Sequence, residues 1–328
     1  MLINKIQQRE NWVDVMKGIC MMFVIISHSF PPSQIIRIYT PFFLTGFFFC
    51  SGYTFNSKNS FHEFVIGKIK TFLVPLVTLS LVNGIVGVIF KGVPFTDRLL
   101  GIVIQRANGY ESLWYIACLF TSELMFYTIF RLSRKWVEGI IACHFVSVIG
   151  FFYIRFVGVA LPWQLELACI AQMFLAWGLY YRKIELSVDN WITDKKYILF
   201  LMTLCYIFLC LIIDNDVNYH EERFANEVLF VAEALISIFI VIRVAKRISN
   251  NKFFLYIGRH SIIYFAFQGF LIVTIRKILV IINISDALIL SLLSSAFAVP
   301  ILSIAAHVIF TYFPFFIGKS WKESKFIR

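Results

Sequence analysis

Long apolar runs follow one another along almost the whole chain, from residue 12 to residue 317. A helix that crosses a bilayer needs about 20 mostly apolar residues. Ten runs approach that length, near residues 12–30, 38–55, 72–90, 111–130, 137–154, 164–181, 197–213, 225–242, 256–275 and 287–312. The sequence therefore predicts an all-α fold, a polytopic integral membrane bundle of about ten transmembrane helices.

The amino-acid composition excludes a soluble protein. Hydrophobic residues make up 59% of the 328 residues and charged residues 15%, against about 45–50% and about 25% in ordinary soluble domains. The gaps between the apolar runs are short, so we expect a single transmembrane domain over residues 1–328. The seven cysteines fall within the runs without metal-ligand spacing, which favours free thiols and no metal site.

The formal net charge is +11, and the basic residues gather in the gaps between the predicted spans. Such residues set topology and meet anionic lipid headgroups, so we predict membrane lipids as partners and no nucleic acid. With the N-terminus in the cytoplasm, the cytoplasmic segments hold 21 Lys and Arg residues and the outer segments 8. The asymmetry predicts that both termini are cytoplasmic. The one acidic cluster, at 214–227, is expected to be a solvated outer loop.

Three ionisable residues lie in the first predicted span, although charge is costly in hydrocarbon. Asp14 and Lys17 are three residues apart and share a helix face. His28 follows Lys17 by eleven residues, about 16 Å along a helix and close to the same face. One stripe therefore carries a cation near one end and an imidazole near the other. Snorkelling of Lys17 to headgroups and a packing role for His28 are the alternatives.

Carboxylates are also predicted at membrane depth. Glu123 and Glu233 lie inside predicted spans, where each needs a partner. Glu166 follows Pro162 and Trp163, so it either lies in the membrane interface or belongs to a site. No Gly-rich phosphate loop and no Gly-x-Ser-x-Gly segment occurs.

Several segments match one family pattern in order. The first span has a Trp–x–Asp segment ending at Asp14 and a basic-residue–x10–His pattern at Lys17 and His28. The later segments are Pro41–Tyr53, Lys68–Pro75, Ser112–Ile116, Gln164–Tyr180 and Tyr256–Tyr264. Together they resemble the acyltransferase-3 family of membrane O-acyltransferases, in its sugar-acetylating, fucose 4-O-acetylase-like branch.

The chain departs from the family pattern at two places. The late motif usually ends in a His where this chain has Gln268. The family's arginine pair before the third span is represented by Lys68 and Lys70, which keep the charge but lose the bidentate fork for phosphate.

The resemblance implies a membrane enzyme that moves an acyl group from cytoplasmic acyl-CoA to a hydroxyl group. The acyl group would most often be acetyl, with acetyl-CoA as co-substrate. The acceptor would be a cell-surface polysaccharide or a lipid-linked sugar, and the location a bacterial inner membrane. His28 suits the role of general base because imidazole titrates near neutral pH.

The expected site residues fall into three groups. The expected catalytic residues are His28, Glu166 as the carboxylate that orients it, with Glu123 as second candidate, and Asp14. The expected contacts to the CoA phosphates are Lys17, Arg9, Lys68 and Lys70. The expected acceptor contacts are Ser112, Trp114, Ser51 and Tyr53.

Two other functional classes remain open. Buried His, Lys and Glu side chains are also found in the proton relays of transporters, so a transporter or flippase of a lipid-linked sugar is the main alternative. A non-catalytic membrane scaffold is the other. The first-span pattern together with Ser112 and Trp114 favours the enzyme, because a transporter has no reason to carry both.

Overall fold

The computed structural model describes residues 10–56, 60–91, 94–105, 113–193, 196–213 and 215–322. Its elements run in the order α1 (Asn11–His28), α2 (Ser33–Phe43), α3 (Thr45–Thr54), α4 (Phe61–Lys68), η1 (Ile69–Leu73), α5 (Val74–Lys91), α6 (Phe95–Ile104), α7 (Trp114–Leu132), α8 (Trp136–Phe156), η2 (Pro162–Gln164), α9 (Leu165–Thr193), α10 (Lys196–Ile212), β1 (Val217–Asn218), β2 (Arg223–Phe224), α11 (Glu227–Arg247), α12 (Lys252–Arg259), α13 (Ser261–Ile281), α14 (Ala287–Tyr312) and η3 (Pro314–Ile317). Within the described residues, every regular element except the two short strands is helical, so the predicted all-α class is confirmed.

Seven helical segments of the described chain are long and apolar enough to cross a membrane, which confirms a multi-pass membrane protein. They are Ser33–Thr54, Phe61–Ile89, Trp114–Leu132, Trp136–Phe156, Glu227–Arg247, Ser261–Ile281 and Ala287–Tyr312. The predicted count of ten is not reached: α1 and α9 are not among the seven, and the apolar part of α10, Tyr197–Ile212, is shorter. Protein rather than lipid surrounds much of α1, so its polar residues are tolerated there.

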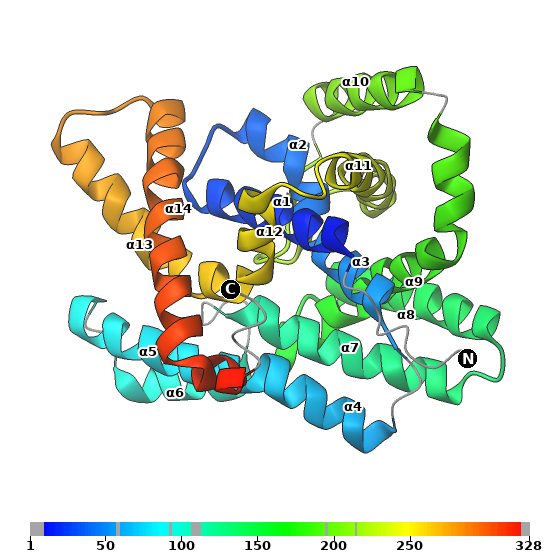
Figure 1. Cartoon of the computed structure of the whole chain (residues 1–328), viewed down its shortest axis with the longest axis horizontal. Helices are drawn as coiled ribbons and strands as arrows, with labels where there is room; N and C mark the ends of the chain where they lie inside the picture. Colours follow the sequence, from blue (N-terminus) through cyan, green and yellow to red (C-terminus); the bar gives the residue numbers. More distant parts are fainter. Residues whose placement is uncertain are drawn as a thin grey trace.

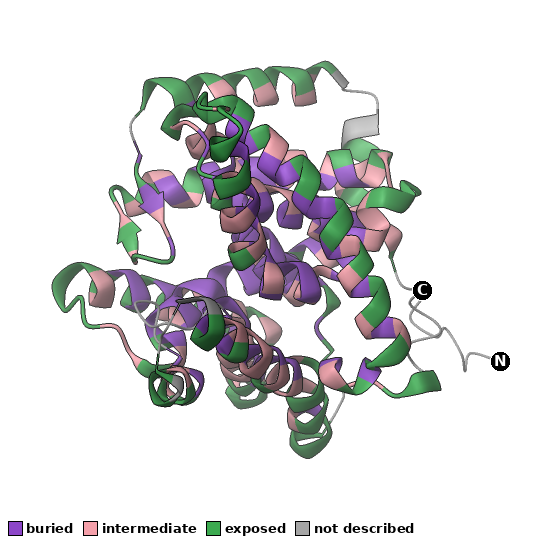
Figure 2. Ribbon diagram, turned by 90° about the vertical axis from the view of Figure 1, so that its left-hand side faces the viewer, coloured by how far each residue is buried: buried purple, intermediate pink, exposed green. Residues whose placement is uncertain are grey.

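Helix α1 lies in the middle of the molecule, against α11, α12 and α13 (Figure 1). A second layer is built by α3 on α9 and by α9 on α8. The buried residues gather where these helices meet, while the outward faces are exposed (Figure 2). This arrangement packs most of α1 against other helices.

Glycines set the closest helix contacts. A Cβ atom on Gly258 of α12 would stand 1.8 Å from the Asp14 backbone oxygen of α1, and one on Gly18 would stand 2.2 Å from the Phe254 oxygen. Gly52 of α3 meets the Leu175 backbone oxygen of α9 in the same way, at 1.9 Å. Small residues allow backbones to approach in membranes, where helix association depends on packing.

Candidate functional site

A cavity of about 690 Å³ lies at the end of the bundle where α1 ends. Its walls come from α1, α2, the start of α7, the segment between α10 and α11, and α13. The polar and charged side chains that line it are Ser27, His28, Ser33, Arg37, Thr40, Asn215, Asp216, Asn218, Tyr219, His220, Glu221 and Arg223, and Trp114 lines it as well. Two of the predicted site residues, His28 and Trp114, therefore share one cavity.

The ring of His28 is held in one orientation. Its Nδ1 lies 2.9 Å from the backbone oxygen of Val24, one turn earlier in α1. A carbonyl oxygen can only accept a hydrogen bond, so Nδ1 carries the proton in this geometry. The Nε2 atom of the neutral ring then has a lone pair, and the side chain is exposed to the cavity. This is the arrangement that a general base requires.

The end of α1 next to His28 is anchored to two other helices. Ser29 Oγ lies 2.5 Å from Ser291 Oγ of α14, and Ser295 Oγ donates to Ser29 Oγ at 3.2 Å. Arg276 of α13 donates through Nη1 to the Ser29 backbone oxygen at 2.6 Å. A cation at a helix C-terminus satisfies carbonyls that have no partner inside the helix. These bonds fix the end of α1, and with it the position of His28, relative to α13 and α14.

The segment between α10 and α11 forms another wall of the cavity, and its strand β1 contacts α2. Its strands β1 and β2 pair antiparallel, with Asn218 opposite Arg223. Arg223 is held on the hairpin by ion pairs to Asp216 at 2.8 Å and to Glu221 at 2.7 Å. The base of the hairpin is tied down by Asn215, which donates to Glu233 of α11 at 2.8 Å.

The hairpin adds to the site a second imidazole that sequence reasoning missed. Asp216, His220 and Glu221 are exposed, as a solvated loop predicts, but they also line the cavity. The ring of His220 meets the Trp114 ring edge-on, with 5.7 Å between centroids. Desolvation by the surrounding protein lowers the pKa of His220 and outweighs Glu221 and Glu222, which raise it.

The carboxylates predicted to orient His28 lie elsewhere. Glu166 is buried at the start of α9, where it accepts from the Leu161 backbone N–H at 3.1 Å and lies against Glu222 of the hairpin. It does not line the cavity. Glu123 of α7 forms an ion pair with Lys68 and accepts from Ser51 Oγ at 2.7 Å. The contact that orients His28 is the Val24 carbonyl, which no side-chain pattern predicts.

Asp14 and Lys17 lie toward the opposite end of α1, whereas Lys70 belongs to η1. Asp14 is buried and accepts from Arg259 Nε of α12 at 3.1 Å. Lys17 is half-buried and Lys70 is exposed. Arg9 and Ser112 lie outside the described residues.

Tyr53 belongs to an ionic cluster at this same end. Its hydroxyl donates to Glu185 of α9 at 2.6 Å. Lys246 of α11 contacts both Glu185, at 2.5 Å, and Asp189, at 2.7 Å, and Arg243 pairs with Asp189. Sequence reasoning missed this cluster because its members come from three helices far apart in the chain.

No metal site emerges from the described residues: no group of three or more His, Cys, Asp or Glu side chains is placed to hold an ion. All seven cysteines are free, and five of them are buried.

A family model described as "Acyltransferase domain" (Acyl_transf_3) matches residues 10–318, nearly the whole chain. No curated protein and no solved structure matches the chain. The matched region includes both α1 and the hairpin, so the His28 cavity and the end of α1 that carries Lys17 lie within it. The chain belongs to the acyltransferase-3 family and is a membrane acyltransferase.

Proposed function

We propose that this protein is an acyl-CoA-dependent O-acyltransferase that acetylates a hydroxyl group of a sugar, with His28 as the general base. One observation carries the proposal. The Nδ1 proton of His28 is committed to the Val24 carbonyl at 2.9 Å, while the ring lines a cavity of about 690 Å³ with polar walls. The lone pair of Nε2 is then available to a hydroxyl group in that cavity.

In the proposed step, Nε2 of His28 takes the proton of the acceptor hydroxyl as its oxygen attacks the thioester carbonyl carbon. A C–O bond forms, the C–S bond breaks, and the electron pair leaves on sulfur. The CoA thiolate takes up the proton that Nε2 accepted, so His28 returns to its neutral form and the products are the O-acyl sugar and free CoA. Trp114 and the hairpin would face the acceptor, because they line the same cavity.

The donor would approach from the end of α1 opposite His28. Lys17 and Lys70 are the predicted contacts of the CoA phosphates, together with Arg9. Lys68 is half-buried and held by its ion pair with the buried Glu123. Lys17 and His28 lie on one continuous helix, eleven residues and about 16 Å apart along the axis. The pantetheine arm would therefore thread partway through the bundle to bring its thioester to the cavity.

We also propose the topology that this path requires, with ten spans and both termini in the cytoplasm. Helices α1, α9 and α10 would cross the membrane in addition to the seven apolar segments. The excess of basic residues in the predicted cytoplasmic segments supports this orientation. The His28 cavity would then open to the outer face of a bacterial inner membrane, where a surface polysaccharide or lipid-linked sugar is found.

The test is release of free CoA by the purified protein from acetyl-CoA, with and without candidate sugar acceptors. We expect release that depends on an acceptor and that falls to background in His28→Ala. The matched control is His307→Ala, which removes an exposed histidine of α14 outside the cavity and should keep full activity. A transporter would release no CoA with any acceptor, and full activity of His28→Ala would overturn the assignment of the base.

A further inference from the structure

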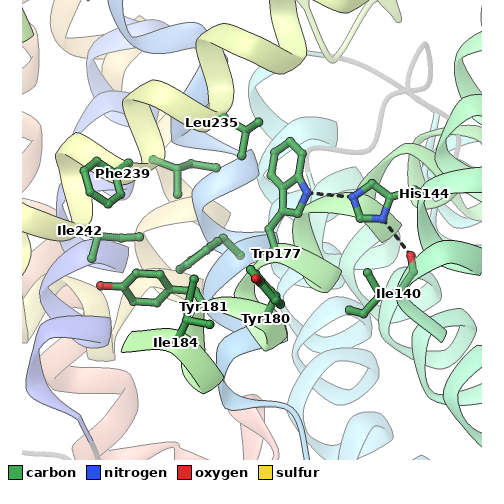
Figure 3. Close-up of a pocket in the computed structure, with 11 residues that line it drawn as sticks. Ile140, His144, Trp177, Tyr180, Tyr181, Ile184, Leu235, Phe239 and Ile242 are labelled. Atoms are coloured by element: carbon green, nitrogen blue, oxygen red, sulfur yellow. Dashed lines mark hydrogen bonds between the residues drawn. The ribbon is translucent and has the colours of Figure 1, made fainter. Parts of the chain in front are cut away.

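A long apolar groove runs down the side of the bundle, between α11 on one side and α8 with α9 on the other. It consists of two cavities, of about 440 Å³ and about 600 Å³. Figure 3 shows the first, with Leu235, Phe239 and Ile242 of α11 facing Trp177 and Tyr180 of α9. The mechanism proposed above uses none of these residues.

The two cavities belong to one groove, because their lining residues form continuous helix stripes. On α8 the stripe is Ile140, His144, Val148, Phe151 and Arg155, at steps of three or four residues. On α11 the stripe is Glu227, Val231, Leu235, Ile238 and Ile242, with the same spacing. Residues at this spacing lie along one face of a helix. From Ile140 to Arg155 the groove is about 23 Å long, against about 30 Å for the hydrocarbon core of a bilayer.

Two polar side chains of the groove wall, those of Trp177 and His144, are paired with each other. Trp177 donates through Nε1 to His144 Nε2 at 2.9 Å, and His144 Nδ1 lies 2.8 Å from the backbone oxygen of Ile140 (Figure 3). The imidazole and indole therefore satisfy their own hydrogen bonds and leave ring surfaces toward the groove. A hydrocarbon chain fits such a wall, whereas a sugar would find few hydrogen-bond partners along it.

The side chain of Arg155 lies at the end of the groove that is nearer the His28 cavity. Arg155 is exposed and forms two hydrogen bonds to Glu227, at 3.0 and 2.9 Å, both through Nη1. Its Nη2 and Nε remain available to an anion. Guanidinium groups bind phosphate well in this way.

The same hairpin separates the groove from the His28 cavity. Successive residues of a strand face opposite sides. On β2, Arg223 lines the His28 cavity, and its neighbour Phe224 lines a small cavity of about 190 Å³ together with Arg155 and Glu227. A molecule whose chain fills the groove and whose phosphate meets Arg155 can thus carry its head over the hairpin into the cavity.

We propose that the groove binds the hydrocarbon chain of the acceptor, which is a sugar linked to a lipid phosphate, with Arg155 at the phosphate. This inference rests on the proposed function for the fate of the sugar. The groove's affinity for a lipid phosphate can be measured without any transfer, so the two claims can fail separately.

The first experiment measures binding of radiolabelled geranylgeranyl phosphate to the purified protein in detergent. Val148→Trp with Val231→Trp should fill the groove, and Arg155→Gln should remove the cation; each should raise Kd about tenfold or more, the loss expected for one charge-assisted contact. Ile149→Trp, on the exposed neighbouring face of α8, is the control for the bulky substitution. Ile149→Trp and His28→Ala should bind as the wild type does.

Two results would overturn the proposal. One is equal binding by all variants. The other is displacement of the probe by phosphatidylglycerol at equal concentration, which would show that the groove takes ordinary membrane lipid.

The second experiment compares an accepted sugar as its geranylgeranyl phosphate derivative and as its methyl glycoside. The groove variants should raise KM for the first about tenfold and leave KM for the second unchanged. Equal effects on both acceptors would contradict a chain-binding groove. Loss of transfer to both acceptors is expected of His28→Ala alone, which separates failure of the base from failure of the groove.

Discussion

Glu123 is a buried carboxylate held by residues from two other helices. Lys68 at the end of α4 pairs with it, and Ser51 Oγ of α3 donates to it at 2.7 Å. The side chain of Glu123 is 5% exposed and that of Lys68 26%. A charge this deep in a membrane protein needs its partner, because the desolvation cost is otherwise uncompensated. The pair therefore serves to hold α3, α4 and α7 together.

This role predicts the effect of Lys68→Met. The substitution should lower the free energy of unfolding by about 2–3 kcal/mol, because it leaves Glu123 buried and unpaired. The double variant Lys68→Met/Glu123→Gln should recover part of that loss. Thermal unfolding of the purified proteins in detergent measures both.

The matched control is Lys70→Met, two residues along and exposed. It should keep the stability of the wild type and raise KM for acyl-CoA, because Lys70 is a proposed phosphate contact. If Lys68→Met instead unfolds like the wild type and raises KM for acyl-CoA, Lys68 binds the donor and is not a structural cation.

Single residues could be predicted where a pattern along one helix specified them. Lys17 and His28 share α1 as expected, and His28 lies in a cavity with Trp114. Residues that act through tertiary contact could not be predicted. His220 and Arg223 reach the cavity because a hairpin folds back over it, and Val24 orients His28 through a backbone atom. Neither feature has a sequence signature.

Helices α3 and α9 pack closely along their length, and glycine makes this contact possible. A Cβ atom on Gly52 would stand 1.9 Å from the Leu175 oxygen, and one on Gly178 would stand 2.0 Å from the Phe49 oxygen. These neighbours are backbone atoms, which cannot rotate away as a side chain can. Tyr53 and Ser51 lie on the same short helix, so this contact also positions two residues of the predicted site.

Gly52→Ala should therefore destabilise the protein by about 1–3 kcal/mol, the usual cost of overpacking. The control is Gly269→Ala in α13, where an added Cβ would meet no atom within 4 Å. That variant should be as stable as the wild type or more so, because alanine favours a helix over glycine. Equal midpoints of thermal unfolding for the two variants would contradict the packing argument.

At the level of elements, hydropathy located apolar helices better than it located the points where one helix ends and the next begins. The predicted span 137–154 corresponds to α8, Trp136–Phe156, and the predicted span 287–312 to α14. The predicted span 38–55 proved to be two helices, α2 and α3, which meet at Leu44. The short helix α6, Phe95–Ile104, was not predicted. Runs of apolar residues record burial in lipid or protein, but a break depends on how neighbouring helices pack.

For the molecule as a whole, the two ends of α1 differ in chemistry. One end carries Lys17 and the ion pair of Asp14 with Arg259, and the other carries His28 in its cavity. The account depends on this separation: a donor enters at the first end, and the acceptor reacts at the second. Membrane sidedness follows, because the ends face opposite surfaces if α1 spans the bilayer.

The most direct test is vectorial transfer in sealed, inside-out membrane vesicles that contain the protein. Acetyl-CoA with a radiolabelled acetyl group is supplied outside, and a water-soluble sugar acceptor is trapped inside. The account predicts labelled O-acetyl sugar in the lumen, lost in vesicles with His28→Ala and retained with His307→Ala. Labelled sugar formed only when the acceptor is outside, on the same side as the donor, would contradict it.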